Sequence, residues 1–188
     1  MMKFLGTAAD TSAKMLKYAR IERERRFILR GLPGALALND PHTQIFDNYI
    51  TGTRLRLRKI RIPERREWIW KLTQKFAPAP PDFSRTVITN IYLSQYEYEI
   101  LSVFEGNEIR KNRYPYKHEG RDYAIDVFLG ALHGLILAET SFDTDEEMDA
   151  FTPPPFAARE VTADEMFTGG SLVHLTSDEI KKRMRAEG

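Results

Sequence analysis

Three segments of the chain predict β-strands: in two of them apolar and charged positions alternate with a period of two, and in the first a period of two sorts a run of five charged residues onto two faces. The segments are IERERRFIL (21–29), RLRLRKIRI (54–62) and EWIWKLTQKF (67–76). Successive side chains of a strand point to opposite faces of its sheet, so each segment has one charged face and one mainly apolar face. The first segment thereby aims two carboxylates and a guanidinium in the same direction.

The rest of the chain predicts further strands and few helices. TVITNIYL (86–93) is rich in β-branched residues, and residues 108–130 followed by 134–143 are typical of two successive hairpins. Capping boxes at Ser94–Glu97 and Thr144–Glu147 predict two helices, and Ser177 is a candidate cap for a last one. Seven or eight antiparallel strands with short connections predict a mainly β (α+β) fold, either a closed barrel or a sandwich.

Length and composition limit the alternatives. The chain has 188 residues, which is typical of one domain, expected over 20–176 between an N-terminal extension (1–19) and a C-terminal helix (177–188). Cysteine is absent, which excludes disulfides and thiolate metal sites and fits a cytoplasmic location. No apolar run is long enough for a signal peptide or a membrane span, so we expect no membrane partner. The net charge of +1 does not indicate what the protein binds, so this has to be inferred from how charge is distributed along the chain.

The charged faces lie either in water, as in an ordinary barrel, or inside the barrel. Arg54, Arg56 and Arg58 share one face and would meet Lys71 or Lys75 on a neighbouring strand. Two like charges about 4 Å apart repel by roughly 4 kcal/mol at an effective dielectric constant of about 20, and a bound polyanion would remove this cost. We therefore expect a barrel with a charged lumen and an apolar outside. In this arrangement Trp68 and Trp70 point outwards and the helix expected at 94–105 covers them.

Six segments, in order, resemble the CYTH, or triphosphate tunnel metalloenzyme, superfamily. IERERRF is similar to its ExExK signature, TRLRLR to its arginine strand and WIWKL to its lysine strand. IRKNRYPY, YAIDVFLGALHGLILAE and REVTADEMFTGGSL resemble its later motifs, so the likeness runs from about residue 20 to 175. The resemblance implies an eight-stranded antiparallel β-barrel tunnel that binds a triphosphate-containing small molecule with Mg²⁺ or Mn²⁺. Known activities of the superfamily are hydrolysis of inorganic or thiamine triphosphate and cyclisation of an adenine nucleotide.

The resemblance also implies roles for individual residues. Those implied as metal ligands are Glu22, Glu24, Asp126 and Glu139, and those implied to bind the substrate are Arg54, Arg56, Arg58, Lys71, Lys111 and Arg113. The arginine repeat leaves open which two of its three members match the phosphate-binding pair. Catalytic roles fall to Arg26, Glu139 and Glu160, and either glutamate is a candidate to accept a proton from water.

The chain departs from the superfamily pattern mainly by losing carboxylates. Ser141 replaces the second acid of the late E-x-E pair, Ala124 stands where a glutamate is common, and Ile88 and Asn90 replace an acidic pair. The lysine of the signature is Arg26 here, which keeps the charge but is hardly able to act as a base. These changes favour one metal ion over two.

We therefore expect a metal-dependent triphosphatase, with two alternatives. A class IV-like adenylate cyclase is less favoured, because the His-Phe pair that precedes the signature in those enzymes is missing and Tyr18-Ala19 lies nearby instead. A non-catalytic protein that binds a nucleotide or polyphosphate is favoured by the lost carboxylates. Nucleic acid is not an expected partner, because the cations alternate with apolar residues and form no exposed stripe. The oligomeric state is left open, with a homodimer among the options.

Overall fold

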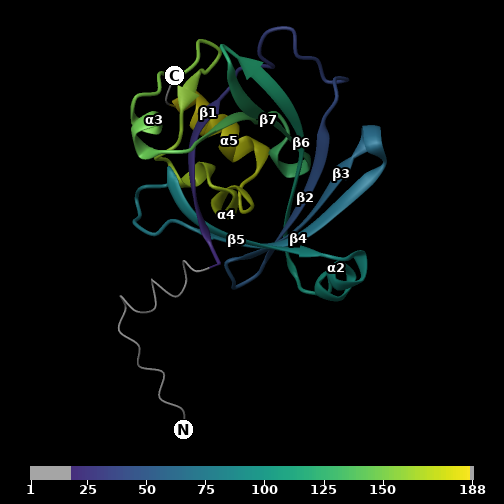
Figure 1. The fold of residues 1–188 in the computed structure, drawn as a ribbon. Coiled ribbons are helices and arrows are strands. Elements are labelled where there is room, and N and C mark those ends of the chain that lie inside the picture. The colour runs from purple at the N-terminus through teal and green to yellow at the C-terminus, as the bar shows by residue number, and fades with distance from the viewer. Residues whose placement is uncertain (1–17, 187–188) are drawn as a thin grey trace.

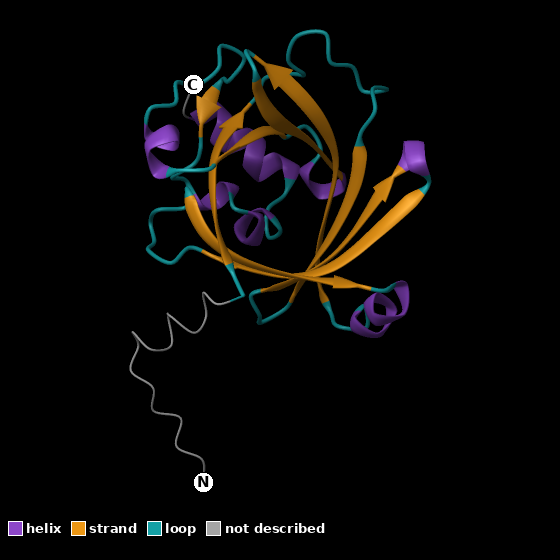
Figure 2. Cartoon of the chain, in the orientation of Figure 1, coloured by secondary structure: helices purple, strands orange, loops and turns teal. Residues whose placement is uncertain are grey.

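A computed structural model describes residues 18–186, without the side chains of residue 181 and residues 183–186. Almost all of the expected N-terminal extension, residues 1–17, therefore lies outside the described residues. Within the described part, strands dominate and the helices are short (Figure 2). None of the helices in residues 18–186 is long and apolar enough to cross a membrane.

Eight antiparallel strands form a closed barrel, which confirms the predicted fold (Figure 1). They are β1 (Arg20–Ile28), β2 (Thr43–Ile50), β3 (Leu55–Ile62), β4 (Glu67–Phe76), β5 (Arg85–Leu93), β6 (Gly106–His118), β7 (Arg121–Leu129) and β8 (Ile136–Phe142). The order is β5-β4-β3-β2-β6-β7-β8-β1, and pairing of β5 with β1 closes the ring. The two-residue strand β9 (Arg159–Glu160) pairs with the end of β1. Strand β2 was not predicted from the sequence pattern.

Two helices begin where their capping residues predict, whereas Ser177, the cap proposed for the last helix, is the first residue of that helix and Thr176 makes the capping hydrogen bonds. Helix α2 (Gln95–Leu101) has the full capping box of Ser94 and Glu97, and the Thr144 side chain caps α3 (Asp145–Asp149). Helix α2 ends at Leu101, five residues before Gly106, where the sequence suggested an end. The remaining elements are η1 (Pro63–Arg65), η2 (Gly130–Leu132), η3 (Glu165–Phe167), α4 (Gly169–Leu172) and α5 (Ser177–Ala186).

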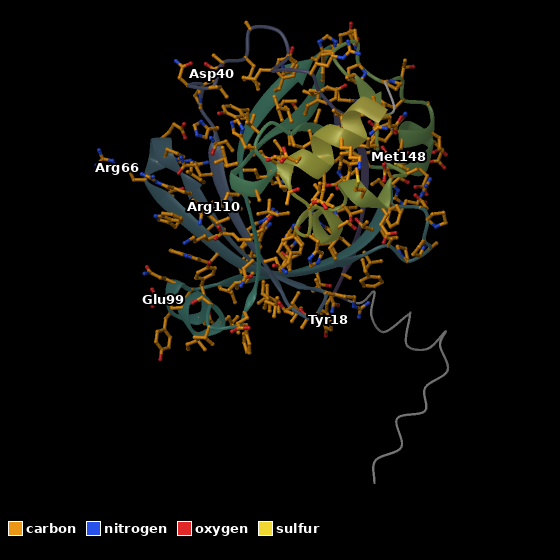
Figure 3. All side chains as sticks on the ribbon, turned by 180° about the vertical axis from the view of Figure 1, so that it is seen from behind. Tyr18, Asp40, Arg66, Glu99, Arg110 and Met148 are labelled. Carbon is orange, nitrogen blue, oxygen red and sulfur yellow. The ribbon has the colours of Figure 1, made fainter. Side chains whose placement is uncertain are left out.

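The outer apolar faces are covered differently from the prediction. Trp68 and Trp70 do point outwards, because they alternate on β4 with Lys71, which pairs with Arg58. Helix α2, however, buries none of its residues, and Trp68 keeps 40% of its surface exposed, so the expectation that this helix covers the tryptophans is wrong for Trp68. Arg66, in the turn after η1, and Glu99, on α2, lie at the periphery of the molecule (Figure 3).

Two apolar clusters stabilise the half of the barrel formed by β1, β6, β7 and β8. Outside the barrel, Phe27, Tyr114 and Ile125 pack under side chains from the loops at 32–36 and 151–157. A second cluster joins interior residues at one end of the barrel to the C-terminal segment, which lies within the outline of the ring of strands in Figure 1. Its members from the strands are Ile28, Ile109, Phe128 and Leu137, and its members from the C-terminal segment include Phe167, Leu172 and Ile180. The C-terminal segment thus closes this end of the barrel.

Candidate functional site

The charged face of β1 points into the barrel. Glu22 and Glu24 both accept hydrogen bonds from the ammonium of Lys75, at 3.0 and 2.9 Å. Lys75 lies on β4, and β5 stands between β4 and β1, so these bonds run across the interior rather than between neighbouring strands. Burial lowers the pKa of Lys75, but Glu24 and Glu22 raise it above its ordinary value, so the lysine stays charged. The two carboxylates therefore share one cation.

A second group of interior charges surrounds Glu139 on β8. Arg26 on β1 donates to Glu139 over 3.0 Å, and Arg113 on β6 donates to it over 2.6 Å. Burial would raise the pKa of Glu139, but Arg113, Lys111 and Arg26 lower it well below its ordinary range. Such a carboxylate is a weak base, because the best proton acceptors have a pKa near the working pH. Glu139 is thus suited to orienting two guanidinium groups.

Asp126 on β7 completes this group from a position with no exposed surface. Arg113 donates to both of its oxygens, at 2.6 and 2.7 Å, and the Lys111 ammonium is also hydrogen-bonded to it. A bidentate guanidinium and an ammonium saturate most of the acceptor capacity of one carboxylate. Asp126 is therefore engaged by cations of its own chain.

A different balance of charge is found on β2, β3 and β4. Asp47 on β2 is buried and accepts two hydrogen bonds from Arg58, at 2.5 and 2.6 Å. Arg56 lies 3.7 Å from the same carboxylate, and its Nε atom is buried without a hydrogen-bond partner. Burial would raise the pKa of Asp47, but Arg58 and Arg56 lower it below its ordinary value. One carboxylate thus serves two guanidinium groups.

Lys71 adds a third cation to this side of the barrel. It pairs in register with Arg58, and no described carboxylate forms an ion pair with its ammonium. Burial, then Arg58 and Arg56, lower the pKa of Lys71 to about 8. The ammonium is therefore held in a partly buried place next to like charges, which costs free energy that a bound anion would recover.

A cavity of about 930 Å³ opens at the end of the barrel away from the C-terminal segment. Its lining includes Glu24, Arg113, Glu139 and Ser141 from the interior. Charged residues of the β6–β7 turn, of the start of β7 and of α3 also line it, among them Glu119, Arg121 and Glu147. Glu24, Arg113 and Glu139 are therefore open to a ligand from this end.

No family model matches the chain. Two curated relatives named inorganic triphosphatase, from Nitrosomonas europaea and Acetivibrio thermocellus, are 36% identical over 91 residues and 37% identical over 95 residues. These matches cover 43% and 45% of the chain, and 60% and 59% of the relatives, so the chain spans about three fifths of the relatives' length. A solved structure, the crystal structure of the inorganic triphosphatase NE1496, is 26% identical and covers 81% of the chain and 93% of its own, with a TM-score of 0.55.

The barrel, the order of the motifs and the two named relatives support the resemblance of the chain to the CYTH superfamily. The closed barrel brings the inward face of β1 to charged residues of other strands: Glu22 and Glu24 meet Lys75 of β4, two strands away, and Arg26 meets Glu139 of the neighbouring β8. The fold thus gathers residues that are more than a hundred positions apart, such as Arg26 and Glu139.

Most of the residues that the sequence proposed for the site come together in the barrel. The interior group contains Glu22, Glu24, Arg26, Arg56, Arg58, Lys71, Lys111, Arg113, Asp126 and Glu139. Two proposed residues do not join it. Arg54 precedes β3, is exposed and lies over the outward-facing ring of Phe76, with its guanidinium carbon 4.9 Å from the ring centroid.

Glu160 also lies away from the interior. It pairs in register with Phe27, whose side chain faces outwards, and it forms an ion pair with Arg25 at 2.5 Å. Its side chain is hydrogen-bonded to Thr162 as well. A carboxylate on the outer face cannot take a proton from a water molecule inside the barrel, so the structure does not support the catalytic role suggested for Glu160.

Sequence reasoning also missed three interior residues. Asp47 and Tyr49 belong to β2, a strand whose apolar and polar residues do not alternate clearly. Lys75 was noted on the charged face of its strand, but Lys71 was chosen for the site. The same strand face carries both lysines, and the curvature of the barrel brings Lys75, rather than Lys71, to the carboxylates of β1.

Proposed function

We propose that the protein hydrolyses a triphosphate-containing small molecule bound inside the barrel. The observation that carries the proposal is a surplus of positive charge on one side of the barrel interior. Three cations, Arg56, Arg58 and Lys71, lie there, and among the described residues Asp47 is the one carboxylate of β2, β3 and β4 that faces them. The names of the relatives support a triphosphate as the anion. Burial of unmatched cations in a folded protein is costly unless a ligand of opposite charge completes the site.

Hydrolysis requires attack of water on a terminal phosphorus atom and cleavage of its bond to the bridging oxygen. For inorganic triphosphate the products are phosphate and diphosphate. Phosphoryl transfer needs little covalent chemistry from a protein, since positioning and charge stabilisation supply most of the rate. We assign this role to Arg56, Arg58 and Lys71, and we assign to Glu139 the orientation of Arg26 and Arg113.

A divalent cation fits one part of this interior. In the described residues, no group of three or more acidic or histidine side chains is arranged to hold a metal ion. Glu22 and Glu24, however, converge on one cation, the Lys75 ammonium. Mg²⁺ commonly binds one or two carboxylates and takes its other ligands from phosphate oxygens and water. We propose Glu22 and Glu24 as ligands of one Mg²⁺ or Mn²⁺, which when bound would polarise a phosphoryl oxygen.

Titration of Mn²⁺ with and without tripolyphosphate tests the metal proposal. We expect weak binding of Mn²⁺ alone and at least about 10-fold tighter binding with tripolyphosphate present, because two carboxylates leave most of the coordination shell to phosphate. The Glu24→Gln variant should lose this difference. The Ser141→Glu variant should tighten Mn²⁺ binding, since residue 141 pairs with Glu24 on the interior face. Equal affinity for Mn²⁺ in both conditions would contradict the assignment.

A binding protein without catalysis is the second candidate, and a specific observation favours it. The four acids of the β1, β7 and β8 interior, Glu22, Glu24, Asp126 and Glu139, all form ion pairs with cations of the chain. A protein that sequesters a polyphosphate would need no free carboxylate. The two candidates differ in turnover.

Release of phosphate from tripolyphosphate, thiamine triphosphate and ATP, each with Mg²⁺ and with Mn²⁺, distinguishes the candidates. We expect phosphate release from at least one of the three compounds. The Arg56→Met variant should lose about 100-fold in rate, the effect of removing one charge-stabilising donor, while Arg54→Met serves as the matched control outside the barrel. Tight binding without turnover would identify a binding protein. Cyclic AMP formed from ATP would identify a cyclase.

A further inference from the structure

The interior end of the barrel that carries Arg56 is lined by the C-terminal segment. Tyr49 on β2 packs against the apolar cluster formed with Phe167, Leu172 and Ile180 of that segment. Tyr49 also pairs in register with Arg56 on β3. The Tyr49 side chain therefore contacts both the closing segment and a cation of the proposed anion site.

Gly169, the first residue of α4, makes the closest approach to Tyr49. A Cβ atom at Gly169 would overlap the Tyr49 hydroxyl group and would lie 3.0 Å from the ring carbon Cζ. Few real Cβ contacts are that close, so any side chain at position 169 would push the tyrosine aside. The neighbouring Gly170 has nothing within 4 Å of its own Cβ position. Two adjacent glycines of one helix thus differ in whether they constrain Tyr49.

Tyr49 in turn lies against Arg56. The guanidinium carbon of Arg56 is 5.9 Å from the centroid of the Tyr49 ring, within the range of a cation–π interaction. Burial lowers the pKa of Arg56, but Asp47 and then Tyr49 raise it above its ordinary value. Arg56 has few other restraints, because Asp47 is 3.7 Å away and its Nε atom has no hydrogen-bond partner. Tyr49 is therefore a main contact that fixes where this guanidinium points.

We propose that Tyr49 is a positioning residue, held by Gly169 of the closing segment so that Arg56 faces the bound anion. The inference rests on the proposed function, because it assigns Arg56 to anion binding. It makes the C-terminal segment a wall of the site in addition to a cover of the barrel end. It also gives a reason for the first glycine of the FTGG sequence at 167–170, because any side chain at position 169 would displace Tyr49.

Calorimetric titration of the full chain with tripolyphosphate tests the inference through a matched pair of variants. The Gly169→Ala protein should bind tripolyphosphate roughly 10-fold more weakly, which is the effect of losing one contact to a charged group. The helix should stay folded, because Tyr49 can move away from the added methyl group. The Gly170→Ala protein should bind tripolyphosphate with an affinity within about 2-fold of that of the unchanged protein. It is a matched control, because both variants replace a glycine of the same helix with alanine and so change helix propensity equally. Equal affinity of the two variants would overturn the inference.

A double-mutant cycle separates an effect through Tyr49 from a general disturbance of α4. Tyr49→Phe removes the hydroxyl group that Gly169→Ala would strike, and it should itself weaken tripolyphosphate binding. If Gly169 acts through Tyr49, adding Gly169→Ala to Tyr49→Phe should change affinity by less than about 2-fold, because the two effects are coupled. Effects that multiply in the double variant would contradict the inference. Tyr49→Phe also keeps the test available should Gly169→Ala fold poorly.

A ligand-free measurement keeps the inference separate from the proposed function. The side-chain ¹H–¹⁵N resonance of Arg56, identified by its loss in Arg56→Lys, should shift in Gly169→Ala and stay in place in Gly170→Ala. This result together with no tripolyphosphate binding by the unchanged protein would support the positioning role and refute the proposed function. An unshifted Arg56 resonance in Gly169→Ala would refute the positioning role whatever the protein binds.

Discussion

The two halves of the barrel interior carry charge in different ways. Around β1, β6, β7 and β8, the acids Glu22, Glu24, Asp126 and Glu139 meet Arg26, Lys111 and Arg113 of the same strands and Lys75, which reaches them from the end of β4. On β2, β3 and β4, Asp47 stands against Arg56, Arg58 and Lys71. The first half is complete without a ligand, whereas the second is stabilised when an anion arrives. In the absence of ligand, charge in the first half therefore stabilises the fold, although Glu22 and Glu24 are also the proposed metal ligands, whereas charge in the second half favours binding of the anion.

The largest effect should follow from breaking the matched half. Arg113→Met removes the cation that contacts both Asp126 and Glu139, and leaves buried negative charge short of a partner. Loss of one member of a buried charge network costs about 3 kcal/mol of unfolding free energy. Urea denaturation at pH 7 measures this loss. An unchanged midpoint would mean that the matched half contributes nothing to stability.

The opposite sign is expected for stability in the cation-rich half. Lys71→Met removes a partly buried ammonium next to like charges, so it should raise the free energy of unfolding at pH 7. Because water screens a partly exposed group, the gain should be limited to about 1 kcal/mol. The same change should weaken tripolyphosphate binding roughly 10-fold, because a charged donor is lost. Paired denaturation and titration measurements check both signs. A Lys71→Met protein that is less stable than the unchanged protein would contradict the difference proposed between the two halves of the interior.

The sequence predicts the inward faces of β1, β3 and β4 better than that of β2, for reasons of pattern. On β3 and β4 charged and apolar residues largely alternate, and on β1 a period of two places Glu22, Glu24 and Arg26 on one face, so these inward faces could be chosen. Strand β2 places Ile45, Asp47 and Tyr49 inwards, and this mixed face has no periodic signal. The buried partner of Arg58 and the contact of Arg56 were therefore invisible until the register was known.

Register and strand ends account for the other errors. The arginine repeat alone could not exclude Arg54, but β3 begins at Leu55 and leaves that residue outside. Glu160 lies in a strand of two residues, which is too short for its periodicity to indicate a face. Which lysine of β4 meets the carboxylates depends on how the strands tilt around the barrel, a property of the closed sheet.

A smaller effect should appear in the protons that accompany binding. Lys71 has a pKa of about 8 in the free protein, and a bound triphosphate would raise it, so binding should take up protons at pH 8.5 and weaken as the pH rises further. Calorimetry in two buffers of different ionisation enthalpy measures the uptake. Lys71→Arg keeps the charge but does not titrate, so it corrects for protons on the ligand. Equal uptake in both proteins would show that Lys71 does not sense the anion.

Stability should depend on pH through the same residue. The pKa of Lys71 in the folded protein, about 8, lies below its ordinary value of 10.5, so the folded state releases this proton first. The contribution of Lys71 to the free energy of unfolding should therefore increase as the pH rises from about 8 to about 10. Lys71→Met should lack this gain, and denaturation at pH 8 and pH 10 compares the two proteins.

The smallest effects are expected outside the barrel. Arg54→Met and Glu160→Gln should change tripolyphosphate affinity by less than about 2-fold, because exposed and outward-facing ion pairs contribute little. Titration of both variants measures this. A 10-fold loss in Glu160→Gln would place this carboxylate in the site after all.

The measurement that tests the central claim most directly is a side-by-side titration of Lys71→Met and Arg54→Met with tripolyphosphate at pH 7. Both changes remove one cation from the same alternating region, but Lys71 lies in the cation-rich interior and Arg54 lies outside. The account predicts roughly 10-fold weaker binding for Lys71→Met and binding within about 2-fold of the unchanged protein for Arg54→Met. Equal losses in the two variants would contradict it, because the anion would then respond to overall charge and not to the barrel interior.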